Sequence, residues 1–107
     1  MKTEILKESN FVNFLNRAYK LDKRIKRPSS GEYKSLKRDE VNGKSQKKLN
    51  ELKQRIEKCI QIFLKNSTDY SIRESLNVLS SLNAQAKDSS DIDSVISMGL
   101  KFTKSFI

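Results

Sequence analysis

Apolar residues recur at steps of three and four along most of this 107-residue chain, and this spacing constrains the fold more than any other feature. The clearest example runs through Leu49, Leu52, Ile56, Cys59 and Phe63. Residues at this spacing share one face of an α-helix, whereas in a strand they would point to both faces. One proline and three glycines are too few for a turn-rich β-protein. The pattern therefore predicts an all-α fold.

Four helices are expected, at about 9–27, 45–65, 71–87 and 90–106. A basic polar connection over 28–44 separates the first two, because Pro28 pushes the residue before it out of helical geometry. Residues 32–43 of this connection either form a short extra helix or remain irregular, and the sequence leaves both open. Short polar residues that can accept backbone hydrogen bonds precede three of the helices. These candidate N-caps are Ser9, then Asp69 or the pair Ser71 and Glu74, and finally Ser90 with Asp93.

Amphipathic helices joined by short turns favour a single domain over 1–107, folded as a small antiparallel up-down helical bundle. The charged fraction of 33% fits a thin bundle, in which much of each helix faces water. Gly99 lies inside the last helix, where a glycine costs about 1 kcal/mol relative to alanine. We therefore expect a neighbouring backbone to approach the chain closely at Gly99.

The residues of familiar catalytic and metal sites are missing. The chain has no histidine, a single cysteine and three isolated glycines, which excludes His-dependent nucleophiles, zinc sites and phosphate-cradling loops. Cys59 belongs to an apolar stripe and is expected to be a small buried residue. Asp88, Asp91 and Asp93 lie where a helix N-terminus favours acids. We expect a protein that is not an enzyme and holds neither a cofactor nor a metal.

The lone cysteine and the absence of a long apolar stretch or an export signal predict a cytoplasmic protein. Its net charge of +9 is unevenly spread. Residues 1–65 carry 18 basic and 8 acidic side chains, whereas residues 66–107 carry 4 and 5. Such asymmetry favours contact with an acidic partner or a nucleic acid. Lysines scattered over helix exteriors also serve solubility alone, so the charge by itself does not decide a function.

The strongest candidate for a binding surface lies between residues 17 and 38. Arg17, Lys20, Arg24 and Arg27 follow steps of three and four, so a continuous helix would place them in one stripe along its side. An exposed Tyr33 and the backbone amides of the loop that follows this stripe would add hydrogen bonds to phosphate oxygens. The candidate binding residues are Arg17, Lys20, Lys23, Arg24, Lys26, Arg27, Tyr33, Lys34, Lys37 and Arg38.

The sequence therefore predicts a non-catalytic helical interaction or assembly module that binds a protein partner, or itself, through its basic N-terminal half. The alternative is weak, sequence-indifferent nucleic-acid binding by residues 17–38, following a phosphate backbone. Lysines outnumber arginines 16 to 6, which does not favour reading of base edges. Binding to an anionic membrane is the least favoured reading, because it would draw apolar residues of the first helix out of the core.

Overall fold

The computed structural model describes residues 2–27, 31–41, 43 and 46–104, except for the side chains of 2–8, 32, 37 and 41. Within these residues the chain is helical and contains no strand. The predicted all-α bundle is thereby confirmed, and of the two possibilities left open for the connection the structure shows the short extra helix. The helices are α1 (Lys2–Leu21), α2 (Glu32–Val41), α3 (Gln46–Lys65), α4 (Tyr70–Gln85) and α5 (Ser89–Phe102).

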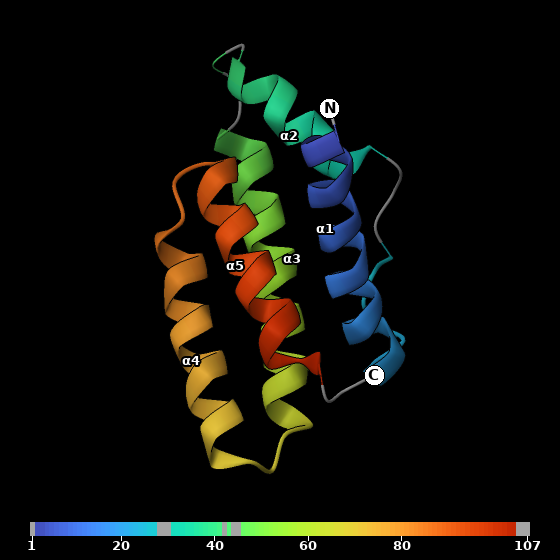
Figure 1. Ribbon diagram of the computed structural model, residues 1–107, viewed down its shortest axis with the longest axis vertical. Coiled ribbons are helices and arrows are strands. Elements are labelled where there is room, and N and C mark those ends of the chain that lie inside the picture. The colour runs from blue at the N-terminus through green and yellow to red at the C-terminus, as the bar shows by residue number, and fades with distance from the viewer. Residues whose placement is uncertain (1, 28–30, 42, 44–45, 105–107) are drawn as a thin grey trace.

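The long helices lie side by side along the 43 Å axis of the molecule, and α2 lies across one end (Figure 1). α1 and α4 each pack against both α3 and α5, so four helices enclose one core. The directions of the helices depart from those of a simple up-down bundle in one respect. α4 runs opposite to α3 and α5, but α1 runs in the same direction as α3 (Figure 1). This direction is set after Leu21, where the chain turns back along α1 before entering α2.

The limits of α1 differ from those predicted. The helix begins at Lys2, so Ser9 lies inside it and the prediction of an N-cap there was wrong. It ends at Leu21 and not beside Pro28, which lies outside the described residues. The carboxylate of Asp22 accepts a hydrogen bond from the backbone N–H of Arg24 at 2.9 Å. An aspartate that binds nearby backbone N–H groups competes with the helix for these donors, so the helix stops here.

The other long helices agree closely with their predicted ranges. Of the two candidate caps before α4, Asp69 is the one used, because its side chain accepts from the Ile72 N–H at 3.2 Å. The predicted cap of α5 at Ser90 was wrong, since Asp88 takes this role and accepts from the Asp91 N–H at 3.0 Å. α5 ends at Phe102, and the end predicted at 106 lies outside the described residues.

α2 is fastened to the start of α5 by two side chains. Both oxygens of Glu40 accept hydrogen bonds from Ser89, one from its backbone N–H at 2.5 Å and one from its hydroxyl at 2.6 Å. The Tyr33 hydroxyl donates to the Ser89 carbonyl at 3.1 Å. A carboxylate at a helix N-terminus satisfies an N–H group that has no partner within the helix, and it also complements the helix dipole.

The core contains the predicted stripe of α3, including Cys59, which is fully buried as expected. A close neighbour does lie at Gly99, but it is a side chain and not the expected backbone, because a β-carbon placed there would lie 2.5 Å from Cε1 of Phe14. Phe14 in turn packs against Phe63 with ring centroids 5.4 Å apart. Leu82 of α4 is 37% exposed. Among the described residues, every helix is too short or too polar to span a lipid bilayer.

Candidate functional site

Residues 22–27, which we call the reversing segment, turn the chain back along α1. Two contacts give the segment its shape. Arg24 donates to both carboxylate oxygens of Asp22, from Nε at 3.0 Å and from Nη2 at 2.8 Å. Arg55 of α3 donates to the Lys26 carbonyl at 2.7 Å. The first contact closes the turn, and the second holds the returning chain against α3.

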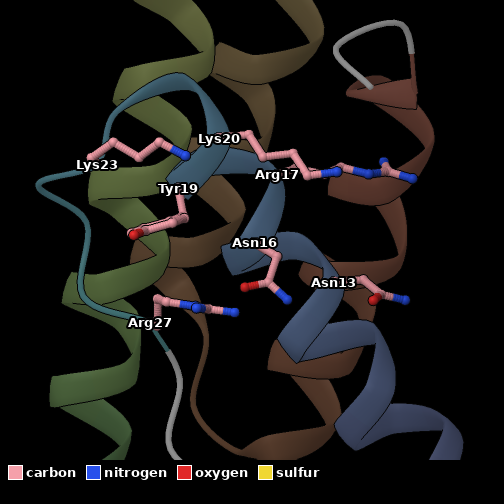
Figure 2. Close-up of a pocket in the computed structure, with 7 residues that line it drawn as sticks. All are labelled: Asn13, Asn16, Arg17, Tyr19, Lys20, Lys23 and Arg27. Carbon is pink, nitrogen blue, oxygen red and sulfur yellow. The ribbon is translucent and has the colours of Figure 1, made fainter.

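The reversal creates an open hollow of about 470 Å³ between α1 and the reversing segment (Figure 2). Tyr19 is one of its lining residues, with the Lys23 ammonium 4.5 Å and the Arg27 guanidinium 5.2 Å from the centre of the ring. In Figure 2 the Lys23 side chain lies above the tyrosine and the Arg27 side chain below it. We call this the basic hollow, and its lining residues are Asn13, Asn16, Arg17, Tyr19, Lys20, Lys23 and Arg27.

The predicted helical stripe of four cations does not form, because α1 ends before Arg24 and Arg27. Arg27 nevertheless returns to the same place through the reversal of the chain, whereas Arg24 turns to the other side and pairs with Asp22. Hydrogen bonds from the side chain and the backbone N–H of Arg24 lower the pKa of Asp22 to about 2. Asp22 is therefore ionised near neutral pH, beside the Arg24 guanidinium.

Arg17 has a structural task in addition to lining the hollow. Its guanidinium donates to the Leu100 carbonyl at 2.6 Å and to the Thr103 hydroxyl at 3.0 Å, at the end of α5. Two other cations also bind the C-terminal ends of neighbouring helices. Lys53 of α3 donates to two carbonyls at the end of α4, and Arg73 of α4 donates to two carbonyls at the end of α3. The last carbonyls of a helix lack partners within it and carry partial negative charge. Part of the positive charge therefore stabilises the fold.

The remaining candidate residues do not join the basic hollow. Tyr33, expected at the surface, is 1% exposed and stacks on Phe11 with ring centroids 5.3 Å apart, so this expectation was wrong. Lys34 and Arg38 are exposed on α2, at the end of the bundle. The Lys26 side chain is exposed as well. The side chain of Lys37 lies outside the described part of the chain.

A second hollow of about 420 Å³ lies on the other side of the reversing segment, against α3. Its floor is made by two half-buried isoleucines, Ile25 from the segment and Ile62 from α3. Both of its carboxylates have partners in the protein: Asp22 binds Arg24, and Glu57 accepts hydrogen bonds from Ser80 and Gln61. We call it the isoleucine hollow, and its lining residues are Asp22, Arg24, Ile25, Glu57, Lys58, Gln61 and Ile62.

Neither hollow has the arrangement of a familiar reaction site. The chain has no histidine, and the described residues include no group of three or more potential metal ligands of the Cys, Asp and Glu types. Burial raises the pKa of the Cys59 thiol to about 12, so it is not a nucleophilic thiolate near neutral pH. The chain matches no family model, no curated protein and no solved structure.

Proposed function

We propose that this protein is a non-catalytic helical interaction module that binds an acidic segment of a protein partner in its basic hollow. The observation that carries the proposal is a concavity of about 470 Å³ that is lined by four cations from two chain segments, of which one, Arg17, is bound to the end of α5. Within the described part of the chain, no carboxylate forms an ion pair with Lys20, Lys23 or Arg27. These side chains are therefore available to carboxylates that a partner brings.

The amides of Asn13 and Asn16 add neutral groups to the wall of the hollow. Each amide nitrogen supplies hydrogen-bond donors and each amide oxygen supplies an acceptor. A peptide offers both backbone N–H and C=O groups as well as acidic side chains, so it suits this mixed lining. The cations that line the same hollow complement the charge of an acidic partner and increase the rate of association with it.

Two features favour a peptide over a nucleic acid. The Tyr19 ring is in contact with Lys23 and Arg27, and stacking of bases on this ring would have to displace a cation. Because α1 ends at Leu21, the cations also surround one concavity and do not follow a line along which a phosphate backbone could run. Nucleic-acid binding therefore remains the second hypothesis, and the experiment includes a DNA probe that tests it.

The test uses fluorescence anisotropy with a labelled peptide rich in glutamate and serine, and with a labelled random DNA duplex, over a salt series. The double variant Lys20→Glu and Lys23→Glu should weaken peptide binding at least tenfold, because opposed charges at the contact become like charges. Its matched control is Lys47→Glu with Lys87→Glu, which changes the net charge equally at exposed positions outside the basic hollow.

Three outcomes would contradict the proposal. Equal weakening by both double variants would show that only net charge matters. Tight duplex binding together with no peptide binding would favour the nucleic-acid reading. A chain that binds neither probe and sediments as a stable dimer would favour self-association.

A further inference from the structure

The two hollows share one wall, the reversing segment, which contributes side chains to both. Lys23 and Arg27 line the basic hollow, whereas Arg24 and Ile25 line the isoleucine hollow. Between them stands a single chain segment, which makes a hydrogen-bonded turn in which the Ile25 N–H donates to the Asp22 carbonyl at 3.2 Å. A ligand that occupies the basic hollow therefore lies beside the isoleucine hollow.

The two hollows differ in the chemistry they accept. The basic hollow offers cations to carboxylates. In the isoleucine hollow, the Asp22 and Glu57 carboxylates balance the charges of Arg24 and Lys58, and both carboxylates already have hydrogen-bond donors within the protein. Its apolar floor of Ile25 and Ile62 remains half-exposed, and such surface favours an apolar side chain.

We infer that the partner segment carries a large apolar residue within two or three positions of its acidic residues, and that this residue occupies the isoleucine hollow. Two residues of an extended peptide advance about 7 Å, enough to pass over a single chain. This inference rests on the proposed function, because the acidic residues bring the segment to the surface and the apolar residue fixes its register.

A second copy of this chain does not supply such a segment from its acidic turn. Asp88 and Asp91 are exposed there, but the neighbouring apolar residue, Ile92, is fully buried in the core. The occupant we infer is therefore a different protein. Its recognition would combine charge, which steers the encounter, with an apolar anchor, which slows dissociation.

The experiment compares two labelled peptides that differ at one position: an octapeptide of glutamate and serine, and its twin with one central serine replaced by leucine. Wild-type protein should bind the leucine twin about tenfold more tightly, because part of the leucine surface leaves water. Ile62→Ser should remove this gain and leave binding of the purely acidic peptide unchanged. Val78→Ser, at an exposed apolar position on α4, is the matched control and should preserve the gain.

The outcomes separate this inference from the function on which it rests. Equal affinity for the two peptides would overturn the inference and leave the acidic-segment proposal standing. A leucine gain that survives Ile62→Ser would place the apolar contact elsewhere and would also overturn it. Failure of both peptides to bind would refute the proposed function. Because Ile62 is only half-buried, Ile62→Ser should keep the helical circular dichroism of the wild type.

Discussion

Replacement of Gly99 by alanine tests the tightest contact in the core. Alanine is favoured over glycine by about 1 kcal/mol inside a helix, so the change would stabilise α5 if there were room. The new methyl group would instead lie 2.5 Å from Cε1 and 3.1 Å from Cδ1 of Phe14. Phe14 is fully buried and packs against Phe63, so its ring has little freedom to move.

Overpacking of this kind costs about 1–3 kcal/mol. After subtraction of the gain in helix propensity, we expect Gly99→Ala to lower the free energy of unfolding by up to about 2 kcal/mol. For a domain of this size each kcal/mol corresponds to a fall of about 4–8 °C in melting temperature. Urea denaturation followed by circular dichroism measures the change directly.

The matched control is Ser97→Ala, at an exposed position of the same helix, which should raise stability slightly through propensity alone. In the background of Phe14→Leu, whose smaller side chain leaves space, Gly99→Ala should become neutral or stabilising. If Gly99→Ala stabilises the wild-type protein as Ser97→Ala does, the reasoning about the Phe14 contact is refuted.

Three further changes probe other contacts. Glu40→Ala should lower the free energy of unfolding by about 1 kcal/mol, because Ser89 at the start of α5 loses its hydrogen-bond acceptor. Urea denaturation measures this loss. An equal loss in the control variant Glu51→Ala, at an exposed position, would contradict the role of Glu40. Tyr33→Phe should also cost about 1 kcal/mol, because a buried hydrogen bond is lost; an unchanged urea midpoint would refute that role. The Cys59 thiol should resist Ellman's reagent at mildly alkaline pH in the folded protein and react fully in urea. Because burial raises its pKa from 9.0 to about 12, this group favours the folded state below pH 9, and the contribution is lost as pH rises toward 12.

Much of the fold follows from the spacing of apolar residues alone. The stripe of α3 predicts both the helix and its buried face, and Gly99 marks a close contact before any neighbour is known. The end of α1 was missed because proline is a conspicuous helix breaker, whereas Asp22 stops the helix through hydrogen bonds that depend on local geometry. The direction of α3 relative to α1 depends on the same turn.

The candidate site was predictable in composition but not in shape. Four of the ten candidate residues line the basic hollow, yet they meet through a reversal of the chain and not along a helix. That reversal depends on Arg55 binding the Lys26 carbonyl, a contact between segments far apart in the sequence. Tyr33 was misplaced because the sequence did not show that α2 packs on the bundle, and the isoleucine hollow appears only when Ile25 lies beside Ile62.

The most direct test of the account is a titration of ¹⁵N-labelled protein with the leucine-containing acidic peptide, followed by amide chemical shifts. The account predicts saturable shifts concentrated in residues 13–27, with a second group near Ile62 on α3. The same titration of the Lys20→Glu and Lys23→Glu variant should leave these amides almost unshifted. Shifts centred on α4 and α5, or no shifts in wild-type protein at low salt, would contradict the claim that the basic hollow is a binding site.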